Sequence, residues 1–265
     1  MTEYALRLSD QERGRYRLMA ETALRTEGEL WAAAGIVEGA SVADVGCGPG
    51  AVSAVLAGLV GPAGRVLAVD GDPEAVASAR ETCELAGVGN VTVAEGDAAD
   101  TGLPAGSVDV AMVRHVLAHN GGREQAIVDH VASLVRPGGT VFLVDIEFGA
   151  LRSRPSDPDI EHLNTTYHGW HAKRGNDLSV GLRLAELLAG AGLEVTHFEG
   201  RYQIIEFPAG MRSPGWAARD AMVASGAATA DDVARWEAAF ARLDGSEKRP
   251  LLFAPVFLAT GRRPS

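Results

Sequence analysis

Short apolar runs alternate with longer amphipathic segments over residues 40–150. The apolar runs end at Gly, Asp or Pro, and the amphipathic segments repeat their apolar positions at helical spacing. Strands that alternate with helices in this way predict an open, parallel α/β sheet. The expected strands lie at 42–45, 65–70, 91–93, 108–113 and 140–145, and the expected helices at 51–57, 72–85 and 123–135.

The pattern changes after residue 150. Residues 151–177 show no periodicity and are rich in proline, histidine and aromatic residues, which is typical of an irregular insertion. A helix is expected at 178–191, a long strand at 193–205, helices over 206–249 with Asp231 as an N-cap, and a closing strand at 251–260. The apolar stripes predicted for these helices are Leu182, Ala185, Leu188 and Ala189, and then Val233, Trp236, Ala239, Phe240 and Leu243.

Two short helices are predicted ahead of the first strand. Ser9 and Glu12 have the spacing of a capping box, so the first helix is expected to begin there and to run through Ala23. Tyr16 shares a face with apolar residues that follow it at helical spacing. The second helix is expected at 29–34.

The stretch Val42-Ala43-Asp44-Val45-Gly46-Cys47-Gly48-Pro49-Gly50 joins a buried strand to a helix. Its glycines can adopt positive φ and carry no Cβ, so the backbone can approach a nucleotide-like ligand closely. Pro49 removes one backbone donor, so the loop favours close approach over a full ring of phosphate-binding N–H groups. With Ala51 and Asp70, the glycine spacing also fits a dinucleotide-binding fingerprint.

An acid two residues before the first glycine favours a site for a cationic ligand over a site for a dinucleotide. With the three glycines, Asp44 resembles motif I of the class I S-adenosylmethionine-dependent methyltransferases, in which this acid helps to fix the loop and the methionine end of the cofactor. A carboxylate at this place suits a sulfonium and an ammonium group better than a diphosphate. The stretches Leu103–Asp109 and Leu134–Asp145 resemble two further signatures of the family, and the two late strands match its reversed final pair.

The resemblance implies roles for acids at the ends of the next strands. Asp70 is expected to accept hydrogen bonds from both hydroxyls of the ribose. Asp97 is expected to accept a hydrogen bond from the adenine amino group, beside the backbone of Ala98. The complete set of cofactor-binding residues that it implies is Asp44, Gly46, Cys47, Gly48, Gly50, Asp70, Gly71, Gly96, Asp97, Ala98, Arg114 and His115.

These observations predict an α/β fold with a Rossmann-like open sheet, mostly parallel with a reversed final strand, plus N-terminal helices and a cap insertion. We expect residues 1–265 to form a single methyltransferase domain. Within it, 1–38 is expected to be an N-terminal helical lid, 39–150 the cofactor-binding core, and 151–177 and 206–250 the segments of a substrate cap.

Composition limits the choice of partners. The 265 residues carry a net charge of -11 without a dense basic block, which argues against nucleic acid. No apolar run approaches the roughly 18 residues of a membrane span, and no signal peptide is evident, so we expect a cytoplasmic protein without a membrane partner. Cys47 and Cys83 suggest neither a disulfide nor a metal site. Abundant glycine and alanine are typical of a bacterial, high-GC coding sequence.

The expected reaction is methyl transfer from S-adenosylmethionine to O, N or C of a small organic acceptor, such as a specialised metabolite or a quinone-like ring. His115 and His119 would share a helix face, but no third ligand lies in register, so we expect no metal there. Two alternatives stay open, a nicotinamide-dependent oxidoreductase and a protein that binds S-adenosylmethionine without methylating. A homodimer is compatible with the sequence. The general-base candidates are His115, His119, His168 and His171, and the expected walls of the acceptor site are Tyr16, Tyr167 and Trp170.

Overall fold

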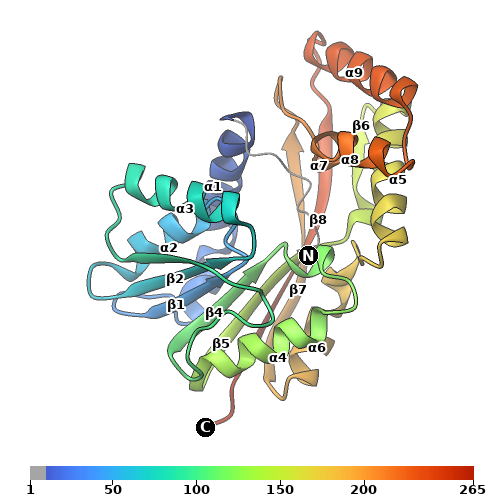
Figure 1. Ribbon diagram of the computed structural model, residues 1–265. Coiled ribbons are helices and arrows are strands. Elements are labelled where there is room, and N and C mark those ends of the chain that lie inside the picture. Colours follow the sequence, from blue (N-terminus) through green and yellow to red (C-terminus); the bar gives the residue numbers. More distant parts are fainter. Residues whose placement is uncertain (1–9) are drawn as a thin grey trace.

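A computed structural model describes residues 10–265 of the chain (Figure 1). At its centre, parallel strands lie in the order β3–β2–β1–β4–β5. Nearly every residue of β1 and β4 is buried, as expected for strands that are covered on both faces. The predicted α/β fold and mostly parallel sheet are therefore confirmed. The strands are β1 (Ser41–Val45), β2 (Arg65–Asp70), β3 (Val91–Glu95), β4 (Val108–Arg114) and β5 (Val135–Ile146).

The final strand, β8 (Leu251–Arg262), runs antiparallel to β5, which confirms the predicted reversal. Its Val256–Arg262 part pairs with β5, whereas its Leu251–Phe253 part pairs with β6 (Arg152–Arg154). On its other side, β8 pairs along its whole length with β7 (Glu194–Glu206). The strands β6, β8 and β7 therefore extend the sheet past the carboxyl edge of its parallel part (Figure 1).

Two groups of helices cover the two faces of the sheet. Trp31 of α1 and Leu56 of α2 belong to the hydrophobic cluster on one face, and Ile127 of α4 and Leu184 of α6 belong to the cluster on the other. This two-sided burial explains the apolar runs of the sequence. The helices are α1 (Asp10–Ala33), α2 (Ala51–Val60), α3 (Pro73–Leu85), α4 (Glu124–Leu134) and α6 (Leu184–Gly190).

The N-terminal region forms one helix where the sequence predicted two. Helix α1 continues through Gly28, although glycine is a weak helix former. Ala23 and Trp31 on either side of it are 2% and 0% exposed, so packing against the sheet outweighs the local preference. The predicted capping box depends on Ser9, which lies outside the described residues.

The prediction of an irregular insertion at 151–177 is wrong for most of its length, because α5 (Pro158–Lys173) forms there. Asp157 caps this helix by accepting hydrogen bonds from the backbone N–H groups of Asp159 and Ile160. Its buried positions do follow helical spacing, but the asparagine, threonines and glycine between them are weak helix formers and hide the pattern. The buried residues are Leu163, Tyr167, Trp170 and His171.

The helix predicted at 178–191 begins later. A 3₁₀ turn at Val180–Arg183 precedes α6 and shifts the buried stripe to Leu184, Leu187 and Leu188. Of the predicted stripe, Leu188 is buried and Ala185 is partly buried, whereas Leu182 is 56% exposed and Ala189 is also exposed.

The segment 206–250, predicted as the second part of the cap, forms α7 (Pro214–Ala217), α8 (Arg219–Ala224) and α9 (Ala230–Asp244). The N-cap of α9 is Thr229 and not Asp231, because Thr229 and Asp232 form a reciprocal capping box. The predicted apolar stripe of α9 is confirmed by three buried members, with the two end residues partly buried: Trp236, Ala239 and Phe240, and then Val233 and Leu243.

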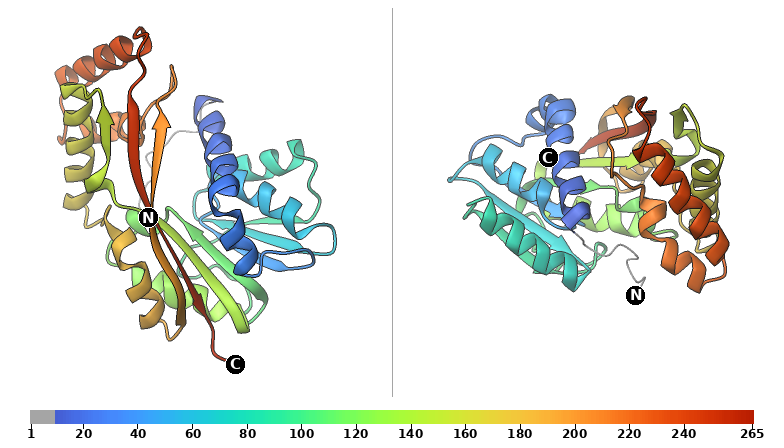
Figure 2. Two further views of the ribbon diagram at one scale, coloured as in Figure 1. Left: turned by 180° about the vertical axis from the view of Figure 1, so that it is seen from behind. Right: turned by 90° about the horizontal axis from the view of Figure 1, so that it is seen from above.

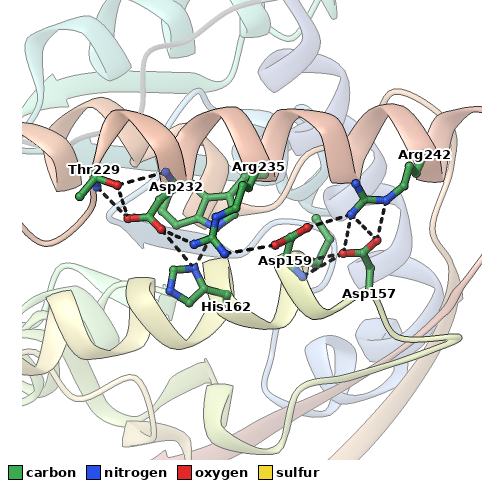
Figure 3. A network of polar contacts seen from close by, with 9 residues as sticks. Asp157, Asp159, His162, Thr229, Asp232, Arg235 and Arg242 are labelled. Carbon is green, nitrogen blue, oxygen red and sulfur yellow. Dashed lines mark hydrogen bonds and ion pairs between the residues drawn. The ribbon is translucent and has the colours of Figure 1, made fainter.

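Helix α9 lies along α5, and polar side chains join the two (Figure 3). The Arg242 guanidinium donates to Asp157 and Asp159, with shortest N–O distances of 2.8 and 3.0 Å. The buried Trp236 indole donates to Nδ1 of His162 at 3.1 Å. These contacts make α5 and α9 one packed unit at the carboxyl side of the sheet.

Candidate functional site

The glycine loop after β1 has the conformation that the sequence predicted. Gly46, Gly48 and Gly50 have φ of +75°, +53° and +78°, a region that favours glycine. A Cβ on Gly46 would lie 2.2 Å from a methyl carbon of Val116, and one on Gly50 would lie 2.9 Å from the Ala79 backbone. At Gly48 a Cβ would meet nothing within 4 Å, so one side of the loop is open.

Asp44 is buried below this loop and acts on it through α2. Its carboxylate accepts a hydrogen bond of 2.6 Å from Ser53 in the first turn of that helix. Burial raises the pKa of Asp44 to about 6, although the Ser53 hydroxyl opposes the shift. Asp44 therefore holds the strand, the loop and the start of α2 together. Burial also raises the pKa of the Cys47 thiol, which keeps it protonated and unreactive.

Asp70 ends β2 directly beside the loop. Its two carboxylate oxygens accept hydrogen bonds from the backbone N–H groups of Gly48 at 2.8 Å and Asp72 at 3.0 Å. Each oxygen can accept more than one bond, so both retain capacity for a ligand's hydroxyl groups. Burial raises the pKa of Asp70, and the two N–H groups oppose that shift. The structure thus brings the predicted ribose acid to the predicted loop.

Asp97 lies at the end of the next strand, after Gly96. Arg123, at the start of α4, pairs with Asp97, and the Ala99 N–H donates to the same carboxylate oxygen at 2.8 Å. The hydrogen bond from Arg123 lowers the pKa of Asp97, so this carboxylate is ionised at neutral pH. It remains half exposed and able to accept a further hydrogen bond. The predicted neighbours Gly71 and Ala98 lie in the same two strand-end loops.

Arg114 ends β4, and its guanidinium is directed at α1. Two of its nitrogens lie 3.1 Å from the two carboxylate oxygens of Glu27, which is 3% exposed. Glu27 also accepts from the Trp31 indole at 3.2 Å, and Arg201 of β7 donates to the backbone carbonyl of Thr26. Helix α1 is therefore fastened to the carboxyl edge of the sheet by a buried ion pair. The sequence does not indicate this role of Glu27, because no local pattern distinguishes it from other acids in the middle of a helix.

His115 follows Arg114 in a strained conformation. Among the described residues it is the one non-glycine residue with a positive φ, at +55°. Its Nδ1 lies 3.9 Å from a carboxylate oxygen of Asp145, at the end of β5. Asp145 is completely buried and accepts from the backbone N–H groups of Ala118 and Ile146. Burial raises the pKa of Asp145 to about 7.

Of the other candidate histidines, His168 and His171 belong to α5, and His119 ends a 3₁₀ turn that follows β4. The rings of His119 and His171 lie 5.0 Å apart, and His168 stacks on Phe148 with centroids 6.1 Å apart. Burial lowers the pKa of His119 to about 4 and that of His171 to about 3. Imidazoles with such low pKa values are neutral and weakly basic at pH 7, so they are poor general bases.

The predicted aromatic walls fall into two groups. Tyr16 is partly buried on α1, whereas Tyr167 and Trp170 are 4% and 6% exposed and pack on the ring of His171 at centroid distances of 4.5 and 4.8 Å. The buried Trp170 indole N–H has no hydrogen-bond partner among residues 10–265. Their contact with an acceptor remains a prediction.

The described residues also contain a hollow at the far side of the sheet. A hollow of about 390 Å³ lies at the opposite, amino edge of the sheet, beside Gly35, Asp109 and Arg136, and it contains no predicted site residue. Over residues 10–265, no group of His, Cys, Asp or Glu is arranged to hold a metal ion, and no helix is long and apolar enough to cross a membrane.

Comparisons with known proteins point to the same core. Residues 42–139 match the protein family described as "Methyltransferase domain". The chain is 41% identical over 106 residues to the nocamycin O-methyltransferase of Saccharothrix syringae, a match that covers 40% of this chain and 37% of that enzyme. The chain spans less than half the length of the first curated relatives that it matches, 44% and 37%.

Solved structures show the same fold over nearly the whole chain. A SAM-dependent methyltransferase from Aquifex aeolicus superposes with a TM-score of 0.52 at 16% identity, covering 94% of this chain and 99% of the other. The YcgJ protein of Bacillus subtilis superposes with a TM-score of 0.59 at 19% identity, covering 90% and 97%. Residues 42–139 therefore resemble a methyltransferase domain, and the chain has the fold of these two solved structures.

Proposed function

We propose that this protein transfers the methyl group of S-adenosylmethionine to a small organic acceptor. The observation that carries the proposal is the glycine loop, whose three positive-φ glycines lie beside Asp70 at the carboxyl edge of the matched core. Ligands of open α/β sheets bind at this edge. The relative that methylates an oxygen supports an oxygen acceptor on a specialised metabolite.

The residues present fit the cofactor. The open side of Gly48 permits close approach, and Asp70 retains acceptor capacity for both ribose hydroxyls. The ionised Asp97 can accept the adenine amino group. When bound, S-adenosylmethionine supplies an electrophilic methyl group. The task left to the chain is to place the acceptor, exclude water and take up a proton where one is released.

His115 is the residue that we assign to proton uptake. Its imidazole lies at the end of β4, is 30% exposed, and faces the buried Asp145 carboxyl group through Nδ1. Asp145 would hold that nitrogen as the N–H, so Nε2 would be the basic nitrogen of the neutral ring and would take the proton of an acceptor hydroxyl. A base in this position contributes about 10²–10⁴-fold to the rate. An acceptor amine that is already unprotonated needs positioning alone.

We place the acceptor between α1 and the cap formed by α5 and α9. The Trp170 N–H would donate to an oxygen of the acceptor, since the indole is buried and lacks a partner within the described chain. Tyr16 and Tyr167 would contribute apolar walls from the two sides.

A labelled-methyl assay tests this proposal. The protein is incubated with methyl-labelled S-adenosylmethionine and a panel of phenols, enols, carboxylic acids and amines. We expect label to move to an oxygen acceptor in the wild type. Binding of the cofactor with conversion of an acceptor but without gain of methyl would contradict methyl transfer and favour a non-methylating use of the fold.

Two variants test the base. His115→Asn should retain cofactor affinity, because asparagine tolerates a positive φ, but turnover of a hydroxyl acceptor should fall by about 10²-fold or more. Asp145→Asn should lower turnover less and should displace the acid limb of its pH profile. A turnover unchanged in His115→Asn would remove His115 from the mechanism.

A further inference from the structure

The part of the sheet beyond its parallel core has an exposed apolar face. Tyr202 and Ile204 of β7 are 67% and 71% exposed, and Leu251 of β8 is 49% exposed. Strands β6, β8 and β7 lie between the cap helices and α1 (Figure 2), and these exposed side chains lie on one face of the strands. We call this surface the back face and define it as Arg152, Arg154, Phe198, Tyr202, Ile204, Glu206, Leu251, Phe253 and Phe257.

The opposite face of the same strands is covered. Val256 and Leu258 are buried against the cluster that contains Trp31 of α1, and Arg201 donates to the Thr26 carbonyl of that helix. Side chains alternate between the two faces of a strand, so this contact places residues 198, 202 and 204 on the other side. The exposure of the back face is therefore a property of one face and not of frayed strand ends.

The apolar side chains of the back face form an ordered layer. The ring of Tyr202 stacks on Phe253 with centroids 4.7 Å apart, and Phe198 stacks on Phe257 at 6.0 Å. Gly200 makes room for the second pair, since a Cβ there would lie 2.9 Å from the Phe257 ring. An ordered, exposed aromatic patch of this kind is typical of a protein–protein interface.

Charge is distributed in a self-complementary way along one row of the back face. Strand register places Arg154, Leu251 and Glu206 in one row across β6, β8 and β7. All three are exposed, so a base stands at one margin of the row and an acid at the other. A two-fold axis parallel to β8 would bring each margin of one copy against the opposite margin of a second copy.

We propose that the back face is the interface of a symmetric homodimer. Leu251 and Phe253 would pack on the same residues of the second copy, and Arg154 would pair with Glu206 of the second copy at both ends of the row. A lipid surface fits less well, because it would leave the Glu206 carboxylate against apolar chains or anionic head groups. Strand β6 leads into α5, so the dimer would also brace the cap.

Sedimentation velocity of the wild-type chain across the micromolar range tests the proposal. We expect a species of twice the chain mass. Arg154→Glu and Glu206→Arg should each raise the dimer dissociation constant by about tenfold or more, since each places like charges together at two symmetric sites. An equimolar mixture of these two variants should recover the dimer, because both margins of the mixed pair again join an acid to a base.

A matched pair of variants distinguishes a loss of the dimer caused by a change on the back face from one caused by a new charge elsewhere on the surface. Ile204→Lys should give a monomer, whereas Leu85→Lys, at an 81% exposed position on α3, should leave the dimer intact. Circular dichroism of each variant checks that the fold is retained. A wild-type monomer at every concentration would overturn the proposal, as would a dimer that survives both charge reversals or a mixture that stays monomeric.

Discussion

The two sides of the candidate site are held together in different ways. At the β1–β2 side, backbone groups make the contacts: the N–H groups of Gly46 and Cys47 donate to the Val69 carbonyl, and that of Gly48 donates to Asp70. At the cap side, side chains make them, as in the Trp236–His162 and Arg242–Asp157 contacts between α9 and α5 (Figure 3). The contact from Gly48 to Asp70 spans 22 positions of the chain, whereas the two cap contacts span 74 and 85.

The ion pair that fastens α1 across the carboxyl edge should give the largest effect. Arg114→Met leaves the buried Glu27 carboxylate without its charge partner, so the free energy of unfolding should fall by roughly 3–5 kcal/mol. The double variant Glu27→Gln with Arg114→Met should lose less than the single one, because no charge then remains buried. Urea denaturation measures both, and equal losses would show that the charge is not what matters.

Substitutions at two glycines of the loop should affect stability and cofactor binding to different degrees. Gly50→Ala combines a positive φ with a clash against the Ala79 backbone, so we expect a loss of roughly 2–4 kcal/mol of stability. Gly48→Ala meets no clash and should cost only about 1–2 kcal/mol, yet it should weaken cofactor binding because it fills the open side of the loop. Denaturation and calorimetric titration measure the two effects. A Gly48→Ala protein with wild-type affinity would remove the loop's open side from the binding site.

The buried His171 of α5 predicts a pH dependence of stability. Burial lowers the pKa of His171 to about 3, against an ordinary value near 6.5, so its contribution to stability is complete above that ordinary value and is lost as the pH falls towards 3. The difference in unfolding free energy between the wild type and His171→Phe should therefore fall by roughly 2 kcal/mol from about pH 7.5 to about pH 5. Asp44 and Asp145 titrate in both proteins and cancel. A difference that does not change with pH would contradict a buried neutral imidazole.

The exposed contacts of the cap should give the smallest effect. Arg242 pairs with Asp157 and Asp159, but its side chain is 52% exposed and solvent screens the attraction. Arg242→Met should therefore leave the melting temperature nearly unchanged. A large fall would show that α9 is held to α5 by charge and not by its buried Trp236 and Phe240.

These differences explain what the sequence could predict. The sequence predicted the parallel strands, the reversed β8 and the loop with Asp44 and Asp70. Short apolar runs and the spacing of the glycines indicate these features within short stretches of the chain. Helix α5 was missed because its buried positions lie among weak helix formers. Glu27 and its bond to Arg114 were missed because the two residues are 87 positions apart and meet only in the folded chain.

The proposed function depends on binding of S-adenosylmethionine by the glycine loop and Asp70. Thermal unfolding with S-adenosylhomocysteine, and separately with NAD, tests it most directly. At about 100 times its dissociation constant, S-adenosylhomocysteine should stabilise the protein by roughly 2.7 kcal/mol, and Asp70→Ala should abolish the shift. Stabilisation by NAD alone, or an equal shift with S-adenosylhomocysteine in Asp70→Ala, would contradict this assignment of the site.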